Sequence, residues 1–182
     1  MAQRKKGSVK RGSGSASVKK ILVPTDFSEG SEPAVQYAAM MARVLKAHLC
    51  LVHVIQPYAY AMTETFNVVD HYSALKAIAE PLLDQARKGL QKAGVSVETD
   101  LLSGVAHREI LKAARRIKAD LIVMGTHGRS GVDHLLLGSV AEKVVRLSPC
   151  PVLTVRTAAK AAGAKKKSAS STGKGSSVTL YS

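Results

Sequence analysis

Five short apolar segments alternate along this chain with four segments of helical periodicity, and this alternation restricts the fold more than any other feature. The apolar segments are 21–23, 48–55, 95–101, 121–124 and 152–155, and the helical segments are 31–46, 72–93, 106–118 and 139–147. Short strands that alternate with helices predict a parallel, doubly wound α/β sheet with helices on both faces. The continuous apolar run at 121–124 is typical of a central strand that is buried on both sides.

Local signals predict where the helices begin and end. Ser31, followed by Pro33, predicts a helix start at which the serine side chain is the cap. Gly94 is expected to end the second helix, because glycine adopts positive φ without steric cost. Pro81 lies within that helix and predicts a kink or a break. Residues 57–70 are expected to form a loop.

The net charge of +14 is concentrated at the two ends of the 182-residue chain. Residues 1–20 hold seven Lys and Arg, residues 156–182 hold six, and neither stretch has an acidic residue. Residues 21–155 hold 14 basic and 13 acidic residues, so that part is close to neutral. We therefore expect a folded domain at 19–156 between disordered basic tails at 1–18 and 157–182, whose composition cannot support a core.

The composition excludes several classes of protein. Two cysteines cannot make a disulfide-rich secreted scaffold, and the six His and two Cys show no zinc spacing. No apolar run approaches the roughly 20 residues of a membrane span, and residues 1–20 lack the apolar region of a secretory signal. We expect a cytoplasmic protein with no metal site and no membrane contact.

A ligand is expected at the carboxyl ends of the strands, because doubly wound sheets bind ligands there, where the strand order reverses. This rule selects Pro24, Thr25 and Asp26 after the first strand. It also selects Val54 at the end of the second strand and Gly125 at the end of the fourth.

A glycine-rich loop follows the fourth strand. Gly125, Gly128 and Gly138 allow backbone N–H groups to approach an anion without interference from Cβ atoms. Ser139 then begins the next helix, whose N-terminus supplies further N–H donors and a partial positive charge. The loop lacks the Gly-Lys-Ser/Thr of a Walker A motif. It still predicts a phosphate site, in which Ser139 caps the helix, binds phosphate, or does both.

The spacing Gly125-x2-Gly128-x9-Gly138-Ser139 resembles the nucleotide loop of the ATP-binding universal stress proteins. Residues 20–28 (KILVPTDFS), 53–54 (HV) and 148–153 (SPCPVL) also resemble that family, in the same order along the chain. The resemblance covers 19–156 and neither tail. It implies a Rossmann-like fold, similar to the adenine nucleotide alpha hydrolases, with a five-stranded parallel sheet in the order 3-2-1-4-5.

The resemblance further implies that the chain binds ATP, in a regulatory or stress-resistance role without dedicated catalysis. Asp26 would bond the adenosine part, with Pro24 and Thr25 beside it, and Val54 would meet the adenine through its backbone. Mg²⁺ remains open as a counter-ion, and no catalytic residue is assigned. The residues expected around the ribose and the phosphates are Met124, Gly125, Gly128, Gly138, Ser139 and Val140. Arg129 in the same loop is a candidate phosphate contact, and a solvated loop charge is the equal alternative.

The last strand, at 152–155, is expected at an edge of the sheet. An exposed apolar edge promotes aggregation unless it is paired. Antiparallel pairing with the same strand of a second subunit would cover it with two-fold symmetry. We therefore predict a homodimer through Val152–Val155.

Two other functions stay open. The tails could bind nucleic acid or another polyanion weakly, without sequence specificity and with strong salt dependence. The same fold could also carry a slow adenine-nucleotide hydrolase. That reading needs a general base or nucleophile beside the phosphates, and the sequence offers no clear one.

Overall fold

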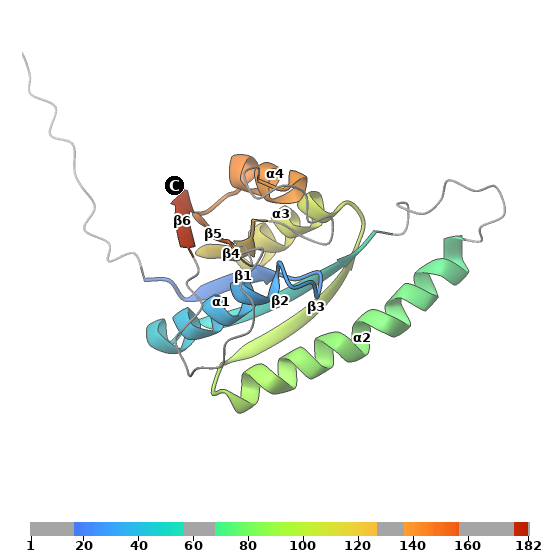
Figure 1. The fold of residues 1–182 in the computed structure, drawn as a ribbon, viewed down its shortest axis with the longest axis horizontal. Coiled ribbons are helices and arrows are strands. Elements are labelled where there is room, and N and C mark those ends of the chain that lie inside the picture. Colours follow the sequence, from blue (N-terminus) through green and yellow to red (C-terminus); the bar gives the residue numbers. More distant parts are fainter. Residues whose placement is uncertain (1–16, 57–67, 127–136, 157–176, 182) are drawn as a thin grey trace, which may run out of the picture.

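The alternating segments form a six-stranded sheet in the computed structural model, with the strand order β3-β2-β1-β4-β5-β6 (Figure 1). The structure describes residues 17–56, 68–126, 137–156 and 177–181, without the side chains of 68–71 and 177–181. Five strands are parallel and have the predicted order 3-2-1-4-5. They are β1 Lys20–Pro24, β2 His48–Ile55, β3 Val97–Ser103, β4 Leu121–Gly125 and β5 Val152–Arg156.

Two helices cover each face of the sheet, as a doubly wound fold requires (Figure 1). The helices are α1 Glu32–Leu45, α2 Val68–Lys92, α3 Ala106–Ile117 and α4 Ser139–Leu147. Successive strand residues point to opposite faces. Ile21 and Val23 therefore join a core with α1 and α2, whereas Leu22 joins a second core with α3 and α4.

The start of α1 agrees with the prediction in position but not in mechanism. Ser31 is the N-cap and Pro33 lies in the first turn, yet no side-chain hydrogen bond caps this helix. The Ser31 hydroxyl instead donates to the carbonyl oxygen of Ser28 at 3.1 Å and lies 3.2 Å from the hydroxyl oxygen of Thr25. The expected capping role of Ser31 is therefore wrong, because the preceding loop engages its hydroxyl.

The second helix, α2, is longer than its periodicity indicated. It begins at Val68, so residues 68–70 are helical where a loop was predicted, and the remainder of that loop, 57–67, lies outside the described residues. Gly94 ends the helix at φ +77° as predicted, and the N–H of Val95 donates to the carbonyl of Leu90 at 3.0 Å. None of the described helices, α2 included, is long and apolar enough to cross a membrane.

Pro81 lies inside a continuous α2 rather than at a break. Proline has no N–H for the helical ladder, and its ring crowds the preceding turn. We expect Pro81→Ala to raise the free energy of unfolding by about 1–2 kcal/mol, less than the full helix-interior penalty of about 3 kcal/mol because proline also restricts the unfolded chain. Denaturant unfolding of the two proteins checks this. Equal or lower stability of the alanine variant would contradict the prediction.

The sixth strand, β6 Ser177–Tyr181, corrects two expectations from the sequence. It lies in the tail that was predicted to be disordered throughout, and it pairs antiparallel with β5 along the whole strand. The average composition of 157–182 conceals the run Val-Thr-Leu-Tyr, whose residue types favour strands. In this structure β5 is therefore not the edge of the sheet. Residues 1–16 and 157–176 lie outside the described part of the chain.

Candidate functional site

The carboxyl ends of three neighbouring strands meet at one edge of the sheet. β1 ends at Pro24, β4 ends at Gly125, and Val54 is the last residue but one of β2. The order β2-β1-β4 places these ends side by side, at the point where the strand order reverses. The N–H of Thr25 donates to the carbonyl of Val52 at 2.9 Å and so fixes the β1–α1 loop to β2.

Asp26 folds the β1–α1 loop around its own carboxylate. Its Oδ1 accepts hydrogen bonds from the N–H and the hydroxyl of Ser28, at 3.1 and 2.5 Å. The buried hydroxyl of Thr25 acts similarly, because its oxygen accepts from the N–H of Phe27 at 3.1 Å. Asp26 itself is half-buried, so its carboxylate is held in position at the rim of the sheet.

His53 supports the same loop from β2. Its side chain is buried, and Nδ1 lies 2.8 Å from the carbonyl oxygen of Thr25, so Nδ1 carries the proton and donates it. The His53 ring lies against that of Phe27, with 4.7 Å between ring centroids. Phe27 has φ of +59°, which is unfavourable for a bulky residue and needs such support. The loop that carries Asp26 is therefore held from two sides.

The helix α4 begins directly beside the end of β4. The N–H of Gly138 donates to the carbonyl of Thr126 at 2.8 Å, which connects the helix start to the residue after the strand. Gly138 is the N-cap, and the N–H of Glu142 donates to its carbonyl at 2.9 Å. The N–H groups of 139–141 precede that bond, as the first N–H groups of any helix do, and they have no helical acceptor.

Ser139 is the first helical residue and not the cap. No side-chain hydrogen bond caps α4 in the described residues, so of the two roles left open for Ser139 the capping role is wrong, and the phosphate role stays a prediction. Ser139 is exposed, and Val140 beside it is half-buried. Two other predicted residues, Gly128 and Arg129, lie outside the described residues.

Two cationic side chains, Lys143 of α4 and Arg108 of α3, act on His107 in the first turn of α3. The pKa of His107 is lowered, first by burial and then by the positive charges of Lys143 and Arg108. Both α3 and α4 begin at the carboxyl edge of the sheet and direct the positive ends of their dipoles there. These two helix ends favour an anion at this edge, and each first turn also carries an acidic residue, Glu109 in α3 and Glu142 in α4.

A sequence profile of the universal stress protein family matches residues 17–156. The chain belongs to the universal stress protein family. Universal stress protein MJ0531 of Methanocaldococcus jannaschii is 37% identical over 141 residues, which are 76% of this chain and 82% of that protein. The solved structure of MJ0577 from the same organism has a TM-score of 0.68 and 33% identity, and covers 84% of this chain and 99% of its own.

A crystal structure of a universal stress protein in complex with cAMP is also similar, with a TM-score of 0.61 and 28% identity. The match covers 78% of this chain and 99% of that chain. The family and the fold implied by the sequence motifs are confirmed by these comparisons.

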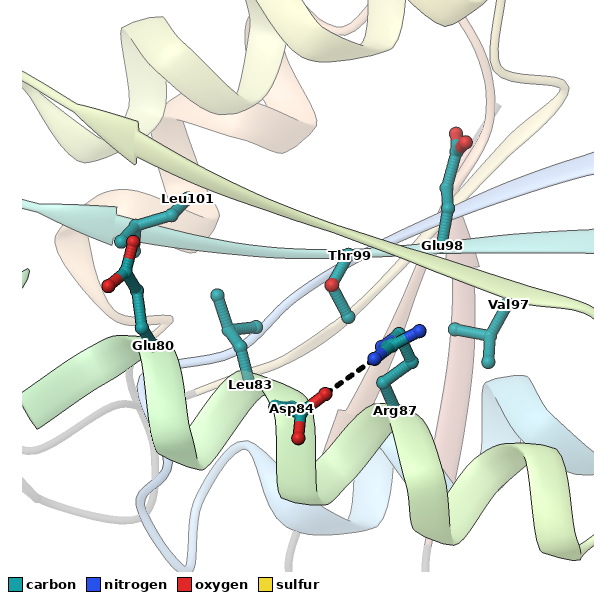
Figure 2. Close-up of a pocket in the computed structure, with 8 residues that line it drawn as sticks. All are labelled: Glu80, Leu83, Asp84, Arg87, Val97, Glu98, Thr99 and Leu101. Carbon is teal, nitrogen blue, oxygen red and sulfur yellow. Dashed lines mark hydrogen bonds and ion pairs between the residues drawn. The ribbon is translucent and has the colours of Figure 1, made fainter.

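A groove of about 470 Å³ lies between α2 and β3 of this universal stress protein (Figure 2). Inside it, Asp84 accepts a hydrogen bond from Arg87 at 2.5 Å and also pairs with Lys88 at 2.7 Å, and these two partners lower the pKa of Asp84. These ion pairs join neighbouring turns of one helix and stabilise it locally. The groove runs along β3 from Val97 to Leu101, and none of its lining residues is one of the predicted site residues. Its lining residues are Glu80, Leu83, Asp84, Arg87, Val97, Glu98, Thr99 and Leu101.

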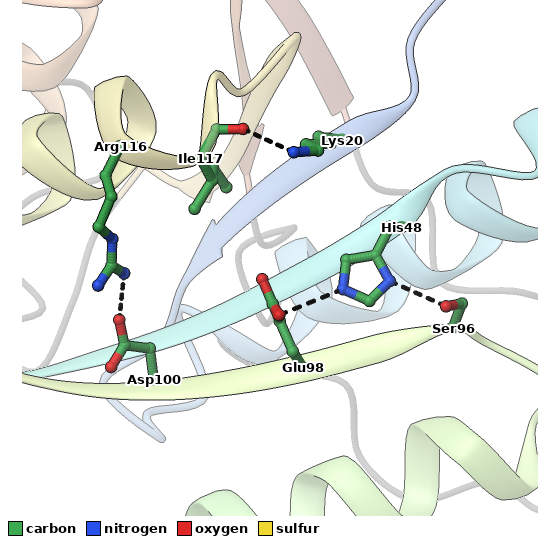
Figure 3. A network of polar contacts seen from close by, with 7 residues as sticks. All are labelled: Lys20, His48, Ser96, Glu98, Asp100, Arg116 and Ile117. Carbon is green, nitrogen blue, oxygen red and sulfur yellow. Dashed lines mark hydrogen bonds and ion pairs between the residues drawn. The ribbon is translucent and has the colours of Figure 1, made fainter.

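A polar network connects β2, β3 and α3 on the opposite side of β3 (Figure 3). Arg116 pairs with Asp100, and His48 lies 3.6 Å from Glu98. Lys20 and His48 are the first residues of β1 and β2, so the network begins at the amino ends of the strands, away from the candidate site. We interpret it as structural. Its members are Lys20, His48, Ser96, Glu98, Asp100, Arg116 and Ile117.

Cys50 lies on β2 beside this network. Burial first, and then the charge of Glu98, raise the pKa of its thiol to about 12. Because the thiolate is the reactive form, and a thiolate of higher pKa is also more nucleophilic, Cys50 should react at pH 8 about thirtyfold to a hundredfold more slowly than a thiol of ordinary pKa. A disulfide reagent measures this in a Cys150→Ser variant, with the same chain unfolded in guanidinium as the reference. Reaction of the folded protein at the unfolded rate would contradict the prediction.

Sequence reasoning missed His53, Phe27 and Ser31 as parts of the site. His53 carries a detectable signal, because it is the one imidazole side chain inside the apolar run 49–55. Phe27 and Ser31 carry none, since their roles depend on the fold of the β1–α1 loop. Among the described residues, no group of three or more His, Cys, Asp or Glu side chains could hold a metal ion.

Proposed function

We propose that this chain is an ATP-binding regulatory protein of the stress response, which binds the nucleotide without efficient turnover. The observation that carries the proposal is the convergence of the β1–α1 loop, the end of β2 and the N-terminus of α4 on one sheet edge. The cAMP complex of a similar universal stress protein supports an adenine nucleotide as the class of ligand.

The β1–α1 loop is proposed to bind the adenosine part. Asp26 offers a carboxylate whose position is fixed by Ser28, next to Pro24 and the buried Thr25. A carboxylate suits hydroxyl and amine donors, which adenosine supplies. Val54 lies at the end of the adjacent strand, where its backbone can meet the adenine.

The phosphates are proposed to lie against the start of α4. The N–H groups of 139–141, the positive helix end and the neighbouring cations all favour a polyphosphate. Mg²⁺, where present, would be held chiefly by the phosphate oxygens, since the described residues offer no metal cluster. The residues assigned to the ribose and phosphates are Met124, Gly125, Gly128, Arg129, Gly138, Ser139 and Val140.

Calorimetric titration of the purified full chain with ATP, ADP, cAMP and adenosine tests the proposal. We expect micromolar binding of ATP, and weaker binding of adenosine because it lacks the phosphates. Native mass spectrometry of freshly purified protein supplies an independent readout of any retained nucleotide. No binding of any of the four ligands at millimolar concentration would overturn the proposal.

A variant of the α4 start separates the phosphate subsite from the adenosine subsite. Ser139→Ala removes an exposed hydroxyl at the first helical position and leaves the Gly138 cap intact. We expect its affinity for ATP to fall about threefold to tenfold, as for one lost hydrogen bond. Its affinity for adenosine should stay unchanged. An equal loss of affinity for ATP and for adenosine would show that Ser139 is not part of the phosphate subsite.

Turnover distinguishes a binding protein from a slow hydrolase. Phosphate release with ATP and Mg²⁺ should stay far below about 1 s⁻¹, the lower end of typical enzyme rates. Sustained turnover above that rate would assign the chain to the hydrolases instead.

The tails support a second candidate function, weak binding of polyanions. The regions 1–20 and 156–182 together hold 13 of the 27 basic residues and no acidic one. Binding to a DNA duplex should weaken steeply with salt and disappear when both tails are removed, while ATP binding persists. We also propose a cytoplasmic location, which cell fractionation can test.

A further inference from the structure

The two sides of the sheet end in strands of very different character. β3 has no partner strand beyond it among the described residues, and it carries Glu98 and Asp100. Charged side chains on an edge strand disfavour pairing with another chain. β5 reads Val-Leu-Thr-Val before its final Arg156, with no charge and no proline inside the strand. The β5 side therefore lacks the protection that the β3 side has.

The C-terminal strand β6 covers this unprotected edge of β5. It pairs antiparallel with all five residues of β5, from Val152 opposite Tyr181 to Arg156 opposite Ser177. With β6 in place, the side chains at 152–155 are almost fully buried, at 1–5% exposure. Antiparallel pairing is also the arrangement that a two-fold axis would impose on β5 and its own copy.

The connection between the two strands bears on which partner β5 takes. Residues 157–176 separate strands whose ends pair directly, and these 20 residues are far more than the two to five of ordinary hairpins. A strand on a connection of this length remains at a millimolar effective concentration toward its own partner strand. A second molecule at micromolar concentration competes poorly against that.

The homodimer predicted through Val152–Val155 needs the outer edge of β5, and we propose that β6 is an internal competitor for that edge. The intact chain then keeps the edge covered and stays monomeric at micromolar concentration. Loss or displacement of β6 frees Val152–Val155 to pair antiparallel with the same strand of another molecule. The predicted homodimer would therefore form through β5 only after β6 has left, and this does not depend on nucleotide binding.

Sedimentation velocity from 1 to 100 µM tests the proposal with three proteins: the full chain, a chain ending at residue 176, and a Val178→Pro/Thr179→Pro variant. Successive N–H groups of a strand alternate in direction, so one of the two at 178 and 179 must point toward β5. Two adjacent prolines therefore remove one N–H group that pairs with β5. The matched control is Val178→Thr/Thr179→Val, which keeps the composition and the strand-forming residues.

We expect the full chain and the control to sediment as monomers of 19.2 kDa. The truncated and double-proline chains should dimerise at least tenfold more tightly. Hydrogen exchange then locates the surface, since the β5 amides that point away from β4 should be protected in the full chain, exposed in the dilute truncated chain, and protected again in its dimer. Truncated protein that remains folded and monomeric at 100 µM would overturn the proposal. So would a full chain that dimerises as tightly as the truncated one.

Discussion

Leu51→Ala is expected to lower the free energy of unfolding by about 3 kcal/mol, because it removes a large side chain from the centre of the sheet. Leu51 is fully buried in β2, between Val23 of β1 and Thr99 of β3 in the strand register. It belongs to the core that the sheet forms with α1 and α2. The loss combines the transfer of the removed methyl groups with the cavity left behind, since neighbouring strands cannot collapse to fill it.

The matched control is Leu147→Ala at the end of α4, where the leucine is 48% exposed. The same change of side chain should cost less than about 1 kcal/mol there, because much of that surface already faces water. Urea unfolding followed by circular dichroism compares the two variants with the parent. Equal losses at both positions would show that the sheet centre is not the dominant core.

The order of elements could be predicted from periodicity alone, because strand and helix patterns differ in repeat length. The end of the second helix could likewise be predicted from Gly94 alone, since the residue after a helix so often needs positive φ. These features depend on a few consecutive residues. The strand order needed more, namely the motifs at 20–28, 53–54 and 148–153, which identified the family.

Features that depend on contacts between distant residues could not be predicted in this way. Ser31 has the residue type of a cap, but its hydroxyl is engaged by the Ser28 carbonyl and lies next to Thr25. His53 acquires its role only when β2 lies beside β1 and brings its ring to the Thr25 carbonyl. β6 could not be predicted, because a short strand in a basic, low-complexity tail forms only by pairing with the edge of an existing sheet.

The substitution Asp26→Ala is expected to weaken ATP binding about tenfold to a hundredfold. A hydrogen bond to a charged group contributes about 1.5–3 kcal/mol, and Asp26 is the carboxylate proposed to receive the adenosine donors. The affinity for adenosine should fall by the same factor, because the lost contact lies at the nucleoside end of the ligand. Ser139→Ala, in contrast, should leave the affinity for adenosine unchanged. Calorimetric titration with both ligands measures the two factors. Affinity for ATP within twofold of the parent would remove Asp26 from the site.

Two controls separate a ligand contact from a collapsed loop. Ser28→Ala removes the hydroxyl that donates to Asp26 at 2.5 Å but keeps the carboxylate, so it tests the loop alone. Asp84→Ala removes a carboxylate of α2 that pairs with its helix neighbours Arg87 and Lys88, so it tests the charge alone. If Asp26 contacts the ligand, both controls bind ATP far better than Asp26→Ala does. If Ser28→Ala is as weak as Asp26→Ala, the carboxylate acts by shaping the β1–α1 loop, and His53 and Phe27 become the residues that determine affinity.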